Sequence, residues 1–454
     1  MPETKFLTKP RSNRAAWIVV GLLIACAPVV RVVAADARSD CCLELTERIA
    51  ALEATTATHG NRKVALKISG WINAAILAWQ DHGGAIDSRD QAFADRNSGA
   101  YVVNNSAAQT RFNIEGVAKV TPDFIAGFSL SLRPWGSKLG DVSQIDSNPS
   151  TPSNSSPGNV EVRDTFTFID ARNFGKWQLG EQVSAADSAW YQDLGGSSTW
   201  ITNMNPGAWN TSFGLRDANG GLTDVAWGGL LQELSDNQAP RLAFYSRQVE
   251  GFQAAASVGS QTWALALYYS RQRGSLNVAA GIGYDVSYGE AALSSQLVGR
   301  TLVDATSTRL AKLGLSGTVF ESKLGLYATA GYSRVAAVLD GRGDATNLYG
   351  KLGWRRNVSG LGETNFYGEY DRTSQAYANG VNAQVWGAGV TQDLDATGSV
   401  LYAGFRHANL ETGIDGANLI LTAAQKASGA SPTLAAAIPA QSFDAVLAGL
   451  AVQF

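Results

Sequence analysis

The chain has 454 residues, of which 17% are charged, and its formal net charge is −3. This charge balance argues against nucleic acid as a partner, because phosphate binding needs a basic surface. The mean hydropathy of −0.07 is well below that of a protein built from membrane-spanning helices. The 48 glycines, 12 tryptophans and 14 tyrosines suit strands with one apolar and one polar face.

Residues 1–37 have the three parts of a secretory signal peptide. A basic segment, an apolar run over residues 15–30 and small residues at 34–37 follow in the expected order. The basic residues are Lys5, Lys9, Arg11 and Arg14. Two alternatives remain open: an uncleaved anchor, which Arg31 disfavours because it interrupts the run, and lipidation at Cys26. The chain is therefore expected to be exported.

Residues 38–60 are predicted to form a short periplasmic helix. Coiled-coil core spacing is met by Cys42, Leu45, Ile49, Leu52 and Thr56. A helix of this length is unstable alone, so several copies could pack along the seam, although a plain amphipathic helix has the same pattern. The neighbouring Cys41 and Cys42 could link subunits, and their spacing is not that of a zinc site.

From Val64 onward the hydrophobic period changes to two, so residues 61–454 are predicted to form an all-β, transmembrane antiparallel β-barrel. The final segment alternates most clearly and ends on phenylalanine, which is typical of outer-membrane barrels. We predict that Leu450, Val452 and Phe454 are the signal for the barrel-assembly machinery. As an open edge this strand would aggregate, whereas a closed barrel in lipid has no edge.

The connections set the expected number of strands. Short turns are predicted at Thr121–Asp123, Asn173–Gly175, Glu250–Gly251, Gln272–Gly274, Glu321–Ser322, Ser359–Leu361 and Ala396–Gly398. Longer connections are predicted at 81–108, 136–160, 183–239, 289–306 and 409–441. Alternating turns and longer loops are the organisation of outer-membrane barrels, and about sixteen strands fit this spacing. A barrel of that size encloses a water-filled channel.

The longest connection, 183–239, lies between the fifth and sixth predicted strands and is rich in aromatic residues. It is therefore expected to pack against the barrel wall as a pore-constricting loop. Its acids would face basic residues at inward strand positions and create a transverse field. The predicted pore-lining residues are Arg111, Arg133, Arg163, Asp187, Asp193, Arg241, Lys351, Arg355 and Arg406. Each one taken alone fits an ordinary solvated lumen or rim charge better, so the prediction rests on the set and not on any single member.

Enzymatic chemistry has little support in the sequence. The histidines His59, His82 and His407 fall in a linker, a loop and a strand end, where each fits a surface residue better than a catalytic base. We find no phosphate-binding glycine loop and no His-Glu metal pair. No catalytic residue, metal or cofactor is expected.

Two stretches resemble a known family. The segment Asp40–Ala57 runs into Gly60-Asn61-Arg62-Lys63-Val64 and then Ser69-Gly70-Trp71, as at the start of mature alphaproteobacterial porins. Pro240–Tyr245, followed by Gly251-Phe252, resembles the strand pair after the constriction loop of these porins. The resemblance implies a sixteen-stranded barrel, a homotrimer, a loop folded into the lumen and passive transport of small hydrophilic molecules. Thr58-His59 departs from the family pattern.

Three functions are thus open. The first is a general-diffusion porin in the outer membrane, with small polar solutes and the lipid bilayer as its partners. The second is a substrate-specific channel for a sugar or an anion, in which the aromatic loop forms a stacking track. The third is a structural, adhesive or enzymatic barrel without an open lumen. Conductance separates the third from the others, and block by micromolar solute separates the second from the first.

Overall fold

A computed structural model describes residues 64–83, 96–134, 138–147, 160–202, 206–231, 238–288, 309–337, 344–375, 378–418 and 436–454. The chain divides into two compact units, 1–52 and 53–454, and every described residue belongs to the second. The predicted signal peptide, the predicted helix over 38–60 and both neighbouring cysteines lie outside the described residues. No helix in the described ranges is long and apolar enough to cross a membrane.

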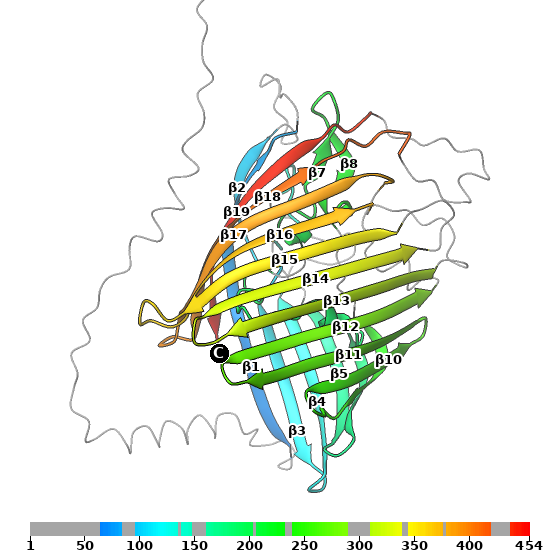
Figure 1. Ribbon diagram of the computed structural model, residues 1–454, viewed down its shortest axis with the longest axis vertical. Helices are drawn as coiled ribbons and strands as arrows, with labels where there is room; N and C mark the ends of the chain where they lie inside the picture. Colours follow the sequence, from blue (N-terminus) through cyan, green and yellow to red (C-terminus); the bar gives the residue numbers. More distant parts are fainter. Residues whose placement is uncertain are drawn as a thin grey trace, which may run out of the picture. The chain divides into compact units, whose positions relative to one another are not determined.

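One antiparallel sheet forms the wall of the second unit (Figure 1). Its strands are β1 (Ala65–Asp81), β2 (Ser98–Val103), β3 (Arg111–Lys119), β4 (Phe124–Pro134), β5 (Val160–Ala171), β6 (Gly175–Gln182), β9 (Ala239–Ser246), β10 (Phe252–Gly259), β11 (Thr262–Arg273), β12 (Leu276–Tyr288), β13 (Arg309–Glu321), β14 (Leu326–Ala337), β15 (Ala345–Arg356), β16 (Thr364–Ser374), β17 (Asn382–Leu394), β18 (Ser399–Leu410) and β19 (Gln441–Gln453).

The sheet closes on itself, because β1 pairs with both β19 and β3. One half of β1, from Ala65 to Trp71, pairs with β3, and the other half, from Ala75 to Gln80, pairs with β2. β2 and β3 therefore share one position, and the seventeen strands of the sheet occupy sixteen positions in a closed barrel. The predicted all-β barrel of about sixteen strands is confirmed. β2 lies within a stretch that the sequence analysis assigned to a connection.

The two ends of the barrel differ. All seven predicted turns connect neighbouring strands at one end, where β1 also begins and β19 ends. At the other end the connections include 134–160, 182–239 and 410–441. At this same end only two residues join β10 to β11, so not every connection there is long.

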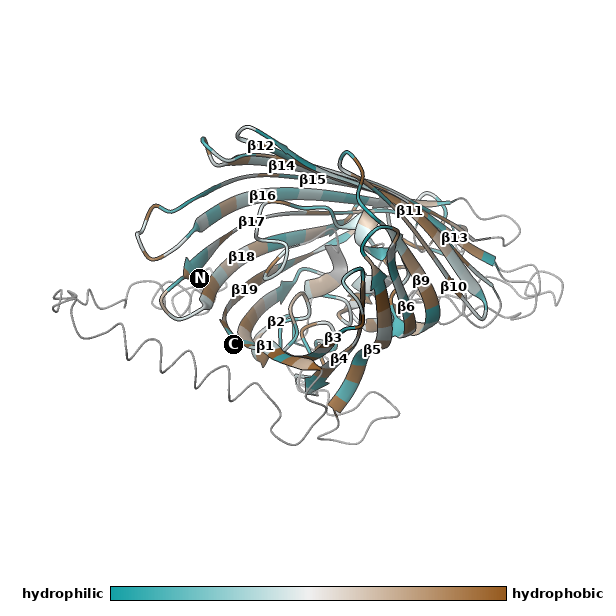
Figure 2. Cartoon of the chain, turned by 90° about the horizontal axis from the view of Figure 1, so that it is seen from below, coloured by the Kyte–Doolittle hydropathy of each residue, from teal (hydrophilic) through white to brown (hydrophobic). Residues whose placement is uncertain are grey.

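Hydrophobic and hydrophilic residues alternate along the strands (Figure 2), and large hydrophobic residues are exposed at outward positions, as the alternation predicts. On β19, Leu450 and Val452 are each 42% exposed and Phe454 is 53% exposed. Phe454 also closes the barrel: its backbone exchanges hydrogen bonds of 3.0 and 3.1 Å with Gly70, and its ring lies 5.4 Å from that of Phe112. Side chains at the alternate positions of these strands point inward.

Candidate functional site

The connection between β6 and β9, which we call the inner loop (residues 183–238), packs against the inside of the barrel. It contains the 3₁₀ turns η2 (Asp187–Trp190), η3 (Pro206–Trp209) and η4 (Trp227–Gly229) and a hairpin of β7 (Gly214–Arg216) and β8 (Leu222–Ala226). Its described residues contact wall strands from β10, where the backbone N–H of Ala185 donates a 3.0 Å hydrogen bond to Ser257, round to β1. The described part of the inner loop therefore covers this side of the wall, and the contacts given in the next three paragraphs do not include β3–β5.

In the first contact, η2 packs against a part of the wall where the inward residues are glycines. Gly281, Gly283 and Gly314 lie at inward positions of β12 and β13. A Cβ atom at Gly281 would lie 2.7 Å from Cα of Ala189, and one at Gly314 would overlap the indole of Trp190. These glycines are needed because the loop backbone approaches the strands closely. Trp190 is consequently 2% exposed.

The second contact is a buried polar network. Lys351 on β15 forms an ion pair with Asp193 and donates a 3.0 Å hydrogen bond to the hydroxyl of Ser197. Arg406 on β18 donates a 2.8 Å hydrogen bond to Glu369 on β16, and Thr202 bonds to the same carboxylate. The side chains of Lys351, Asp193, Arg406 and Glu369 are at most 5% exposed. Buried charges need such partners, so this network holds residues 193–202 on the wall.

The third contact is an apolar core between the inner loop and β1 and β19. Phe213 lies with its ring centroid 5.0 Å from that of Trp79 and 4.7 Å from that of Phe443. Beside them the Nε atom of Arg216 lies 2.7 Å from a carboxylate oxygen of Asp81, with both side chains almost fully buried. Apolar inward residues of β1 and β19, such as Leu77, Trp79, Phe443 and Leu447, are buried beneath the inner loop.

The uncovered wall carries three arginines on three successive strands, β3, β4 and β5. We call Arg111, Arg133 and Arg163 the arginine cluster; they lie close enough to repel one another. Arg111 stacks 4.5 Å above the ring of Trp71, Arg133 donates a 2.7 Å hydrogen bond to Gln109, and Arg163 lies 3.7 Å from Asp164. Within the described ranges, the buried Nε atoms of all three have no acceptor. The arginine cluster therefore adds positive charge to this part of the inner wall.

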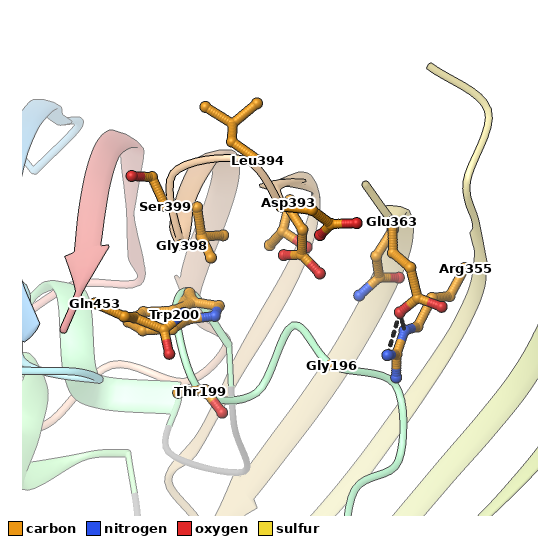
Figure 3. Close-up of a pocket in the computed structure, with 14 residues that line it drawn as sticks. Gly196, Thr199, Trp200, Arg355, Glu363, Asp393, Leu394, Gly398, Ser399 and Gln453 are labelled. Atoms are coloured by element: carbon orange, nitrogen blue, oxygen red, sulfur yellow. Dashed lines mark hydrogen bonds and ion pairs between the residues drawn. The ribbon is translucent and has the colours of Figure 1, made fainter. Parts of the chain in front are cut away.

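A pocket of about 350 Å³ opens at the turn end of the barrel, between the inner loop and β15–β18 (Figure 3). Trp200 forms one side of it, and Arg355 and Glu363, which form an ion pair, lie on the other. Asp393 and Asp395 add two further carboxylates to its lining. The lining of this turn-end pocket therefore carries more negative charge than the wall at the arginine cluster.

The structure thus divides the predicted charged residues into groups. Arg111, Arg133 and Arg163 come together on the uncovered wall. Lys351, Asp193 and Arg406 lie between the inner loop and the wall, and Arg241 is buried 3.9 Å from Asp285. Arg355 lies at the turn-end pocket, and Asp187 begins η2 and is half-buried.

Three charged residues that the sequence reasoning missed are Asp81, Arg216 and Glu369. The sequence does indicate Glu369 as an inward residue, because it lies between the outward residues Gly368 and Tyr370 of the same strand. Asp81 and Arg216 are 135 positions apart, and no local pattern links them.

Comparison with known proteins gives one family and a set of similar folds. The family model described as Gram-negative porin matches residues 50–413. The fold is similar to an anion-selective porin from Comamonas acidovorans, with a TM-score of 0.51, 15% identity and coverage of 86% of this chain and 100% of that one. It is also similar to in-vitro folded OmpT, an outer membrane protein of Vibrio cholerae, with a TM-score of 0.51, 12% identity and coverage of 87% and 99%. No curated protein sequence matches.

Proposed function

This chain belongs to the Gram-negative porin family and forms a passive diffusion channel in the outer membrane, and we propose that the channel prefers small hydrophilic anions. The observation that supports this preference is the arginine cluster on the uncovered wall. A unit charge about 7 Å from an ion in water contributes about 0.6 kcal/mol, which is about a threefold change in local ion concentration. Three arginines therefore favour anions by up to about 20-fold before screening by salt.

The inner loop sets the width of the passage in this proposal. It covers the wall from β10 to β1, so solutes pass between the loop and β3–β5. Asp193, Lys351 and Arg406 act here as anchors of the loop, because each is buried in an ion pair. In this proposal the charges of the arginine cluster generate most of the transverse electric field expected from the sequence. Asp187 and Arg355 contribute less to it, because they lie at its margins.

Reversal potentials in planar bilayers under a KCl gradient test the anion preference. Replacement of Arg111, Arg133 and Arg163 by glutamine should lower the ratio of chloride to potassium permeability by about tenfold or more at low salt, while conductance remains. Arg271→Gln is the matched control, because Arg271 lies at the turn end in an exposed pair with Glu250. An unchanged permeability ratio in the triple variant contradicts the proposal.

A specific stacking channel is the second candidate, and the structure offers it less support. Trp190, Trp209, Trp227 and Phe213 are each at most 2% exposed, so these rings are packed against the wall and not presented to solutes. Single-channel block by a sugar or an aromatic acid at micromolar concentration would favour this candidate over general diffusion.

Assembly completes the proposal. We propose a homotrimer, as the resemblance to alphaproteobacterial porins implies, in which residues 38–60 of three chains pack together after residues 1–37 are removed. We also propose that Leu450, Val452 and Phe454 are read by the barrel-assembly machinery. Deletion of residues 40–58 should lower the temperature at which the oligomer dissociates on a gel without closing the channel. An unchanged dissociation temperature would overturn the coiled-coil assignment.

A further inference from the structure

The outward wall carries a groove that diffusion through the barrel does not use. This outer groove has a volume of about 800 Å³ and lies over β13–β17. Its outward-facing lining residues are Gly317, Val319, Ala328, Ala330, Gly350, Leu352, Gly368, Tyr370 and Trp386. Almost all of this lining is apolar, so the groove accepts a hydrocarbon.

Register explains why the wall is hollow here. Gly317 pairs with Ala330, and Ala330 pairs with Gly350, so three adjacent strands place small residues side by side. In the next row toward the turn end, Ala328 on β14 pairs with Leu352 on β15, and Leu352 pairs with Gly368 on β16. Paired residues of an antiparallel sheet point to the same face, so the small residues of these rows form a depression, bordered by Leu352, which is 69% exposed. A Cβ atom on Gly350 would meet nothing within 4 Å.

Two arginines stand above the groove on the same outward face. Arg334 lies four residues beyond Ala330 on β14, and Arg372 lies four residues beyond Gly368 on β16, in both cases toward the loop end. Four residues span about 13 Å along the strand and, at a strand tilt of about 45°, about 9 Å along the membrane normal. The arginines therefore lie nearer the loop end than the groove does, within reach of one acyl chain. Tyr370 at the loop-end edge of the groove and Tyr332 beyond the groove on β14 lie on the side of the arginines, where interfacial aromatic residues are expected.

Arg334 and Arg372 each form an exposed ion pair whose carboxylate can be replaced by another anion. Arg334 pairs with Asp344 and Arg372 pairs with Glu411, and the arginine side chains are 55% and 45% exposed. Such exposed pairs contribute little stability. A phosphate group competes well for them, because it takes two parallel hydrogen bonds from a guanidinium group.

We propose that the outer groove, Arg334 and Arg372 form a binding site for a phosphorylated lipid of the outer leaflet. An acyl chain lies in the groove, and the phosphate is held by the two arginines. The position of the two arginines on the loop-end side of the groove, and the match of their positive charge to phosphate, distinguish this occupant from a second copy of the chain. The site concerns the outside of the barrel and is independent of ion preference in the lumen.

Native mass spectrometry of the full chain in an uncharged detergent tests the proposal. The probes are dioleoylphosphatidic acid, dioleoylglycerol, which has the same chains without phosphate, and inorganic phosphate. The wild type should bind phosphatidic acid about tenfold or more tightly than dioleoylglycerol and should not retain inorganic phosphate. Arg334→Gln with Arg372→Gln should remove that preference, and Gly350→Leu should weaken binding of both lipids because leucine fills the groove.

Two variants serve as matched controls and should bind the lipids as the wild type does. Arg271→Gln removes an outward, paired arginine at the opposite end of the barrel, and Ala254→Leu adds the same bulk on the outward face of β10. Equal loss of binding in the controls, or phosphatidic acid binding that neither groove nor arginine variants change, overturns the proposal. Dissociation of the oligomer by Gly350→Leu with lipid binding retained assigns the groove to a subunit interface and also overturns it.

Discussion

Replacement of Lys351 by methionine should release part of the inner loop. Methionine has nearly the same length and keeps the packing, whereas Asp193 is left buried without its cation; Thr329 and the backbone N–H of Gly195 remain as its hydrogen-bond donors. Removal of one partner of a buried ion pair costs about 3–5 kcal/mol. Because each 1.4 kcal/mol is a factor of ten, the population with residues 193–202 displaced should rise by about two to four orders of magnitude.

Single-channel recording measures this population directly. The wild type should give steady currents, and Lys351→Met should add frequent transitions between current levels, since the loop borders the passage. The barrel itself should stay folded, because η2 and the core around Phe213 still hold the loop at its two ends. The double variant Lys351→Met with Asp193→Asn removes both charges and should recover most of the steady current, as a coupled pair requires.

Steady wild-type currents from Lys351→Met would refute the assignment of this ion pair as an anchor. The same conclusion would follow if the double variant were as noisy as the sum of the single variants, since independent sites add. Arg271→Met is the control for loss of a cation, because its exposed pair with Glu250 should contribute at most about 1 kcal/mol.

Two further predictions follow from close contacts. Gly314→Leu should displace Trp190 and lower stability by about 1–3 kcal/mol, measured by thermal unfolding, whereas Gly350→Leu, which faces open space outside, should not. Phe454→Ala should reduce the amount of protein in the outer membrane of cells far more than Phe112→Ala does, although both remove the same ring contact; equal losses would reduce Phe454 to a packing role.

The barrel could be predicted because its signals are local. Each turn is marked by a few residues, and each strand alternates with a period of two, so Leu450 and Val452 are assigned to the outward face from sequence alone. Closure follows once the strands are counted. β2 was not found, since its six residues are too few to show a period and they follow a long polar stretch.

The interior was harder, because an inward side chain can face water or the inner loop. Arg111 and Lys351 have the same strand pattern, yet Arg111 lies on the open wall and Lys351 is fully covered. The difference depends on where the inner loop runs. That path is set by contacts such as Asp81 with Arg216, which no spacing rule brings together. The glycines at 281, 283 and 314 were the available sign of close approach, since inward glycine leaves room for another backbone.

Pairing of β1 with β19 has a consequence for biogenesis. The seam joins Trp71 to Gln453, so the first and last strands must meet before the cylinder exists. A nascent chain that lacks its last strand leaves the edges of β1 and β18 unpaired and uncovers Trp79, which stacks on Phe443 of β19. Unpaired strand edges and uncovered apolar side chains are prone to aggregation. Holding factors in the periplasm should therefore protect the chain until its last strand has arrived, because the seam with β1 can close only then.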